Sequence, residues 1–281
     1  MLNADLEPTG RWWGYGEKTQ FSEKLTGEMA DASTIKDKQA RYKKAPTLAL
    51  ANSLTSFHES RGETASAIAL VKDAIGLAPE QKSELRLQVL EMQFAMVMGE
   101  KEGASLKDLE TTMDEVLNDP KTKAEAKVAA IRQAGRFYYD KGQKKEAFAM
   151  LEKLHPMDRD KLSEDGQKDY DVGTTYMSWG KDYDRFFKTP AKVDAALLKS
   201  YAGDYGPRHL SFNEGRLHYK RGENAPLPLI PIAKNMFFIE GKPFFHLEVV
   251  VGEDGNPSKL VGHYAEGNTD ESERDENEAV N

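Results

Sequence analysis

The sequence contains no cysteine among its 281 residues. That absence excludes a disulfide framework, a thiolate zinc site and a cysteine nucleophile together. The sequence also lacks any run that approaches the ~18 uncharged apolar residues of a membrane-spanning helix, so we expect no membrane span. Hydrophobic residues make up 39% and charged residues 31% of the chain, a composition typical of a globular protein with room for about two domains.

A surplus of positive charge is lacking as well. The net charge is −8, and a tail from Thr269 to Asn281 holds six of the acidic residues against a single arginine. The remaining 268 residues therefore carry a net charge of only −3, and a nearly neutral body without a basic stripe does not favour nucleic-acid binding. Because the tail 269–281 has almost no apolar residues to offset its ordering entropy, we predict that it is disordered.

The start of the chain lacks the basic and apolar regions of a signal peptide. The compartment stays open: cytoplasmic if the protein begins at Met1, and bacterial periplasmic or secreted if Met1 is a trimmed start. Residues 1–32 have no helical or strand periodicity, which predicts an irregular N-terminal arm. Its adjacent Trp12 and Trp13 either pack on the helices that follow or dock on an upstream domain or a partner.

Residues 33–190 are predicted to be a helical domain. Intervals of five and seven residues recur in two sets, which are Gly62, Ala67 and Ala74, and Gly142, Ala147 and Leu154. Small residues let two antiparallel helices approach closely, and a glycine with positive φ ends the first helix of each pair. The spacing therefore predicts helical hairpins.

These hairpins resemble the tetratricopeptide repeat, a helix–turn–helix unit of ~34 residues. The resemblance rests on Leu48–Gln81 and Val128–Lys161. Two further parts are inferred from spacing, namely a hairpin at Lys82–Pro120 and the first helix of a final unit at Asp169–Gly180. It implies that the first helices of the units line a concave surface that holds a peptide.

After Pro190 the pattern changes to a period of two, and turn residues such as Asn213-Glu214-Gly215 recur. We predict a small antiparallel β domain over residues 191–268. Its strands are expected at His209–Asn213, Arg216–Arg221, Leu227–Ile232, Met236–Ile239, Phe244–Val251 and Lys259–Tyr264.

The segment Asp194–Gly267 resembles a small β domain found at the carboxyl end of penicillin-binding-protein-like serine hydrolases and some bacterial peptidases. The motifs that carry the resemblance are Tyr201-Ala-Gly203-Asp-Tyr205, Phe212-Asn-Glu-Gly215, Leu229-Ile-Pro231 and Asp254-Gly255. The resemblance implies a lipocalin-like partial barrel with an accessory role and without catalytic residues.

The candidate binding groove consists of residues on the first helices that helix packing is not expected to use. They are Arg86, Leu90, Phe94, Arg132, Arg136, Tyr139, Tyr170 and Thr174. Arg132 and Arg136 are four residues apart and share a helix face, and residues 121–154 hold nine Lys or Arg against four Asp or Glu. This charge favours a protein or peptide with an acidic or C-terminal carboxylate segment, with Leu90 and Phe94 gripping its apolar side chains. The alternative interpretation is a solvated face without a ligand.

No catalytic constellation stands out in the sequence. Ser33-Thr-Ile-Lys36 fits the Ser-x-x-Lys pattern of penicillin-binding-like hydrolases, in which the lysine activates the serine. It lies just before the helical hairpins, without a downstream Lys-Thr-Gly, so we assign Ser33 as a helix N-cap. Gly-x-Ser-x-Gly, His-Glu-x-x-His and a phosphate-binding Gly-rich loop are absent too, and we expect no cofactor.

Four residues of the predicted strands have side chains that zinc accepts, namely His218, His246, Glu248 and His263. With a period of two, His218, His246 and Glu248 could share the sheet face that points away from the apolar one. No closely spaced pair of ligands anchors such a site. The prediction is therefore polar residues on a solvated face, with no metal.

Together these features predict an α+β chain, in which a tetratricopeptide-like α-helical repeat precedes a small antiparallel lipocalin-like partial β-barrel. We expect a non-enzymatic scaffold that binds a protein or peptide in the groove of the repeat. The alternative is the C-terminal accessory region of a serine hydrolase or peptidase whose catalytic domain lies upstream or on a separate chain.

Overall fold

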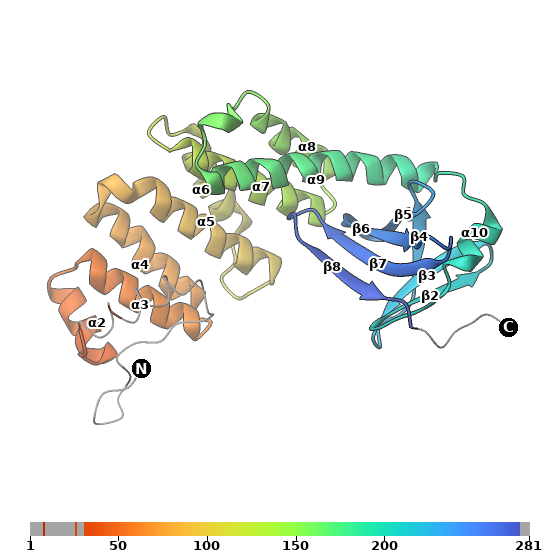
Figure 1. Ribbon diagram of the computed structural model, residues 1–281. Helices are drawn as coiled ribbons and strands as arrows, with labels where there is room; N and C mark the ends of the chain where they lie inside the picture. The colour runs from red at the N-terminus through yellow and green to blue at the C-terminus, as the bar shows by residue number, and fades with distance from the viewer. Residues whose placement is uncertain (1–7, 9–25, 27–30, 276–281) are drawn as a thin grey trace. The chain divides into compact units, whose positions relative to one another are not determined.

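The computed structural model describes Pro8, Thr26 and residues 31–275. It is an α+β structure in which helices precede an antiparallel sheet, as the sequence predicted (Figure 1). The chain forms two compact units that divide between Asp169 and Tyr170, inside one long helix. The boundary predicted after Pro190 therefore lies too far along the chain, and most of the predicted arm 1–32 falls outside the described residues.

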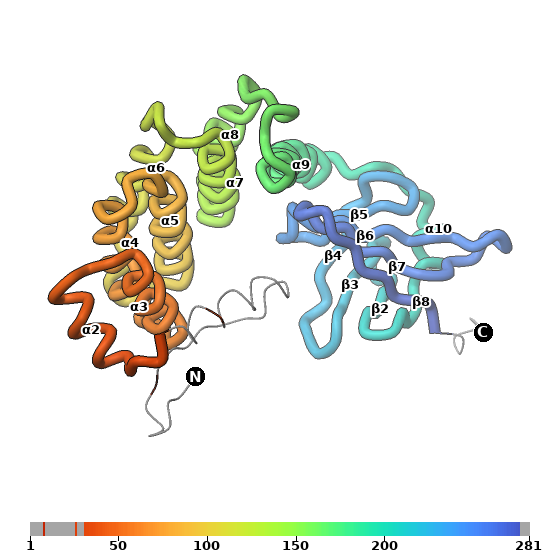
Figure 2. Tube along the Cα trace, turned by 60° about the vertical axis from the view of Figure 1, so that its left-hand side comes forward, coloured from red at the N-terminus to blue at the C-terminus, as the bar shows by residue number. Residues whose placement is uncertain are grey.

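The first unit is built from helices, of which Figure 2 shows α3–α4, α5–α6 and α7–α8 as successive hairpins. The elements are α2 (Ile35–Lys44), α3 (Leu48–Ser60), α4 (Thr64–Leu77), α5 (Lys82–Met98), α6 (Leu106–Asn118), α7 (Ala124–Asp140), α8 (Lys144–Leu151) and the start of α9 (Glu164–Lys188), with short 3-10 turns at Pro79–Gln81, Glu152–Leu154 and Arg159–Lys161. Among the described residues, no helix has both the length and the apolarity to cross a membrane.

The hairpins α3–α4 and α7–α8 use the small residues that the sequence pattern singled out. Ala67 of α4 and Ala147 of α8 are fully buried where the paired helices meet. Gly62 and Gly142 follow α3 and α7 with φ values of +74° and +77°, a conformation that glycine adopts without a steric penalty. The predicted hairpins are therefore present at both places.

The second unit contains the end of α9, the short helix α10 (Ala195–Ser200) and eight strands, each antiparallel to the next. The strands are β1 (Gly203–Tyr205), β2 (Arg208–Asn213), β3 (Arg216–Arg221), β4 (Leu227–Pro231), β5 (Met236–Ile239), β6 (Lys242–Val251), β7 (Pro257–Tyr264) and β8 (Thr269–Glu273). A hydrogen bond of 2.9 Å from Asp275 N to Asp204 O links the end of β8 to β1, so the sheet is nearly closed into a barrel. Six strands overlap the predicted ones, while β1 and β8 are additional.

Apolar contacts occur on both faces of this sheet. The interior holds fully buried side chains from most strands, such as Leu210, Leu247 and Leu260. On the outer face, Tyr183 of α9 packs with Phe238 of β5, their rings 5.2 Å apart. The end of α9 is therefore an integral part of the β unit.

A strand occupies the start of the segment predicted to be disordered. β8 forms five antiparallel residue pairs with β7. Its Asp270 pairs with the buried Arg208 of β2, and its Glu271 lies 2.6 Å from Lys259 of β7. The prediction of disorder from Thr269 onward is therefore wrong for β8. The composition of a segment does not show that basic side chains of other strands neutralise its carboxylates.

Candidate functional site

The arginines of the predicted groove are each paired with a carboxylate of the first unit. The pairs are Arg86–Asp119 at 2.8 Å, Arg132–Asp169 at 2.7 Å and Arg136–Asp140 at 2.8 Å. Arg86 also lies 3.2 Å from Glu115. Much of the positive charge expected to attract an acidic partner is therefore balanced within the chain.

The apolar residues of the predicted groove belong to the core. Leu90, Phe94 and Tyr139 are all buried. The ring of Phe94 packs on that of Phe137, with centroids 5.3 Å apart. Leu90 and Phe94 lie on the side of α5 that packs on neighbouring helices, since α5 contacts α4, α6 and α7. The expectation that Leu90 and Phe94 grip a partner is therefore not met.

The last two predicted groove residues lie on α9, in the second unit. Tyr170 and Thr174 are both half-buried, and the Thr174 hydroxyl donates to the Asp171 carbonyl at 2.9 Å. The eight predicted residues therefore do not form one surface of a single unit.

A different set of side chains lines an open groove in the first unit. It has a volume of about 250 Å³ and lies between α5, the start of α7 and the start of α9. Small side chains at Ala126, Ala129 and Gly166 leave room for it. Charged side chains around it are Glu84, Glu91, Glu125, Asp165, Asp169 and Lys123. Negative charge therefore predominates in the groove, opposite to the predicted sign.

Local contacts hold several of these carboxylates in place. Lys123 forms a short ion pair with Glu84, and its hydrogen bond lowers the pKa of that carboxyl. Gln133 donates to Glu91 at 2.9 Å across α7 and α5. Lys123 at Glu84, Arg132 at Asp169 and Lys168 at Asp165 offset three of the five carboxylates, so Glu91 and Glu125 leave the groove with a smaller excess of negative charge near neutral pH.

Two of the four residues considered as metal ligands contact each other, and a third pairs with an aromatic ring. His263 Nε2 lies 2.9 Å from Glu248 Oε2, between the neighbouring strands β7 and β6. His246 stacks on Trp179 of α9, with centroids 3.7 Å apart and planes inclined by 20°. His218 lies on β3, with β4 and β5 between it and β6. No group of three His, Cys, Asp or Glu that could hold a metal ion occurs in the described part of the chain.

The sheet face predicted to be solvated is covered by α9 at His246. Burial, together with the charge of His263, lowers the pKa of His246 to about 4. Its Nε2 atom is buried and has no hydrogen-bond partner among the residues that the structure describes. This imidazole is therefore a neutral packing group near neutral pH and not part of a polar surface.

The Ser33–Lys36 pair does not form a catalytic contact. Thr34, and not Ser33 as predicted, is the N-cap of α2, since its side chain accepts a hydrogen bond from Asp37 N at 3.1 Å. The Ser33 hydroxyl donates to Asp31 at 2.5 Å and accepts from Arg41 at 3.1 Å. Asp31 and Arg41 therefore hold the Ser33 hydroxyl in place.

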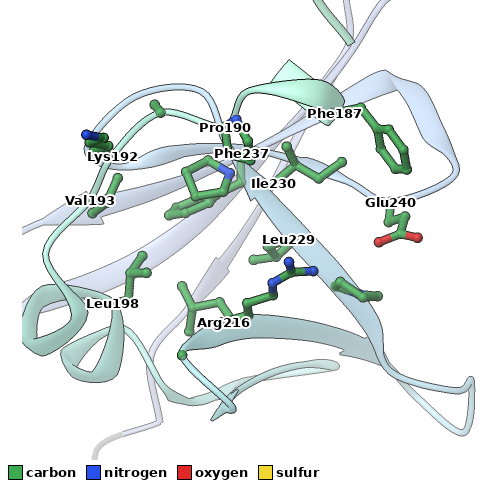
Figure 3. Close-up of a pocket in the computed structure, with 15 residues that line it drawn as sticks. Phe187, Pro190, Lys192, Val193, Leu198, Arg216, Leu229, Ile230, Phe237 and Glu240 are labelled. Atoms are coloured by element: carbon green, nitrogen blue, oxygen red, sulfur yellow. The ribbon is translucent and has the colours of Figure 1, made fainter. Parts of the chain in front are cut away.

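The β unit contains a larger pocket, which the sequence did not predict. Its volume is about 670 Å³, and it is lined by β3, β4, β5 and the segment between α9 and α10. Leu217 and Leu229, which line it, also belong to the barrel core. Figure 3 shows Arg216 in the middle of the lining residues, with Lys192 and Glu240 at opposite edges of the view.

This pocket lies where β3 and β4 separate. The two strands pair only at Tyr219↔Leu227 and His218↔Pro228. Pro228 and Pro231 have no N–H with which to extend the ladder. Beyond the two pairs, both strands line the pocket instead of bonding to each other. The opening therefore begins where the β3–β4 ladder ends, and there the Pro231 carbonyl accepts from Ala191 N instead of from a strand.

Comparison with known proteins does not assign a family or a function to the chain. Neither a protein-family model, nor a curated protein, nor a solved structure matches the chain. The resemblances to the tetratricopeptide repeat and to the β domain of serine hydrolases therefore remain predictions from the residues quoted above.

Proposed function

We propose that this chain is a non-catalytic binding protein in which the helical hairpins are a scaffold for a protein or peptide. In this proposal the hairpins are tetratricopeptide-like units, and the β unit is a lipocalin-like partial barrel with an accessory role. The observation that carries the proposal is the groove between α5, α7 and the start of α9, whose exposed side chains are not used by the core.

The charge of this groove selects the chemistry of the partner. Five carboxylates and one lysine line it, and the arginines that favoured an acidic peptide are paired within the chain. A positively charged segment with small apolar side chains would gain electrostatic attraction along the carboxylates. The proposed partner is therefore basic, in contrast to the acidic one expected from the sequence.

Fluorescence anisotropy with two labelled peptides of equal length tests this proposal. One alternates lysine and leucine, and the other alternates glutamate and leucine. The lysine peptide should bind, and added salt should weaken it because exposed charges are screened. Replacing Glu84→Gln and Glu91→Gln together should weaken binding several-fold, since an exposed ion pair contributes about 0–1 kcal/mol.

A matched double variant, Glu110→Gln with Asp114→Asn, removes the same charge from exposed positions of α6 outside the groove. It should bind the lysine peptide as the original protein does. Equal weakening by both double variants would show that net charge, and not the groove, attracts the peptide. If the protein instead prefers the glutamate peptide, and Arg132→Glu/Arg136→Glu loses that binding, the partner is acidic and the proposal of a basic partner is wrong.

A further inference from the structure

The pocket of the β unit has the size and lining of a site for a small molecule. Its volume of about 670 Å³ falls within the ~300–1,000 Å³ typical of ligand pockets, which are mostly apolar with a few polar groups. Aliphatic and aromatic side chains dominate its wall, and they are Val193, Leu198, Leu217, Leu229, Ile230 and Phe237. These side chains would contact an apolar part of a ligand, and Lys192, Arg216 and Glu240 would contact a polar part.

The segment that follows α9 and lines the pocket is held in place by the sheet. The segment after α9 is bonded to β4 through Ala191 N and Pro231 O, 2.9 Å apart. Two residues further on, Val193 packs against the barrel core. Because β3 and β4 form no residue pair beyond Pro228, the space under this segment is not filled by a strand ladder.

Two cationic side chains at the pocket are available to a ligand. Neither Arg216 nor Lys192 forms a side-chain hydrogen bond or ion pair with any described residue, and both are exposed. Glu240 is the single carboxylate of the lining, so the pocket has an excess of positive charge. In Figure 3, Glu240 lies at the edge opposite Lys192, and Arg216 is the charge nearest the centre.

An aromatic side chain at the rim adds apolar surface that is still open to water. Phe187, in the last turn of α9, is 53% exposed and lines the pocket. One face of its ring stacks on Tyr183, with centroids 5.8 Å apart, which holds the ring at the edge of the pocket. It extends the apolar wall beyond the interior of the barrel.

From these features we infer that the pocket binds a small amphipathic monocarboxylate, with its apolar chain against the barrel core and its carboxylate on Arg216. A planar guanidinium donates two parallel hydrogen bonds to a carboxylate, which fixes the orientation of the ligand. Lys192 adds a second positive charge at the rim. This site is independent of the groove proposed for the helical unit.

Isothermal titration calorimetry with decanoate tests the inference on the full chain. Two further probes have the same ten-carbon chain, decan-1-ol without charge and decyltrimethylammonium with the opposite charge. Decanoate should bind with one site per chain, and decyltrimethylammonium at least about tenfold more weakly. Binding of the cation as tightly as the anion, or no binding of decanoate, would overturn the proposal.

Two variants assign the binding to this pocket. Arg216→Gln should weaken decanoate binding about tenfold, the loss expected for one charge-assisted interaction, and should leave decan-1-ol unaffected. Ala191→Phe places a ring in the cavity while keeping the backbone bond to Pro231, and should abolish binding of both probes.

The matched control is Lys220→Gln, on the same strand as Arg216 but outside the pocket lining. It removes one positive charge and should bind decanoate as the original protein does. Circular dichroism of each variant establishes that it is folded before titration. If Arg216→Gln and Lys220→Gln bind decanoate equally, the carboxylate is not on Arg216 and the inference fails.

Discussion

An ion pair between the buried Arg208 and the half-exposed Asp270 helps to keep an acidic strand in the barrel. Arg208 has a fully buried side chain whose guanidinium contacts Asp270 and lies 3.3 Å from the Ser272 hydroxyl. Burial alone would raise the pKa of Asp270, but Arg208 and Arg221 outweigh it and hold that pKa below its usual value. Asp270 is therefore ionised when the barrel is folded.

Replacing Asp270→Asn leaves the Arg208 charge buried without its carboxylate. We expect the free energy of unfolding to fall by about 3 kcal/mol, the usual range for breaking a buried pair from one side. Urea unfolding followed by circular dichroism measures this change. The control is Glu271→Gln, which breaks the exposed pair with Lys259 and should cost no more than about 1 kcal/mol. Similar losses in both variants would contradict the role given to Arg208.

His246 makes the stability of the β unit depend on pH. In the folded chain its pKa is lowered to about 4, whereas an unfolded histidine titrates near pH 6.5. Between these values only the unfolded chain takes up this proton. The stabilisation that depends on a neutral His246 is therefore complete above about pH 6.5. Up to about 3 kcal/mol of the free energy of unfolding is lost as the pH falls to about 4.

His246→Phe keeps an aromatic ring on Trp179 and removes the titrating group. We expect a smaller loss of stability between pH 7.5 and pH 4.5 than in the original protein, measured as the shift of the urea midpoint. His155→Gln, at an exposed position of the first unit, is the control and should keep the original pH dependence. An unchanged pH dependence in His246→Phe would show that other groups cause it.

At the scale of elements, the approach of α8 to α7 depends on one glycine. A Cβ atom on Gly135 would lie 2.4 Å from Leu151 of α8, closer than packed atoms come. Gly135→Ala should therefore separate the two helices and lower the free energy of unfolding by about 2 kcal/mol. The measurement is again urea unfolding by circular dichroism.

Gly76 of α4 provides the matched control for that substitution. A Cβ there meets nothing within 4 Å, so Gly76→Ala should stabilise the protein by up to about 1 kcal/mol through helix propensity. If Gly135→Ala were also stabilising, the close approach of α7 and α8 would not depend on the glycine.

Elements with a clear local pattern were predictable from the sequence. Period-two alternation bounded by turn residues located six strands, and small residues at fixed intervals located the hairpins of α3–α4 and α7–α8. β8 was missed because its acidic residues are neutralised by Arg208 and Lys259, which lie far away in the sequence. The division between the units was missed because α9 runs through it for 25 residues.

At the scale of the whole molecule, the candidate sites depend on contacts that no local pattern reveals. The spacing of Arg132 and Arg136 correctly places them on one helix face, but their charges are balanced by Asp169 and Asp140. The pocket of the β unit combines the segment after α9 with parts of β3, β4 and β5. These segments are distant in sequence, and their common wall exists only in the folded barrel.

The separation of β3 and β4 also bears on self-association of the protein. A strand that lacks a neighbour offers its backbone to a strand of another molecule, which is a route to aggregation. Prolines in β4 deprive that strand of donors, and Arg216 places a charge on the strand opposite. The prolines and the arginine at this gap therefore also disfavour the addition of a strand from another molecule.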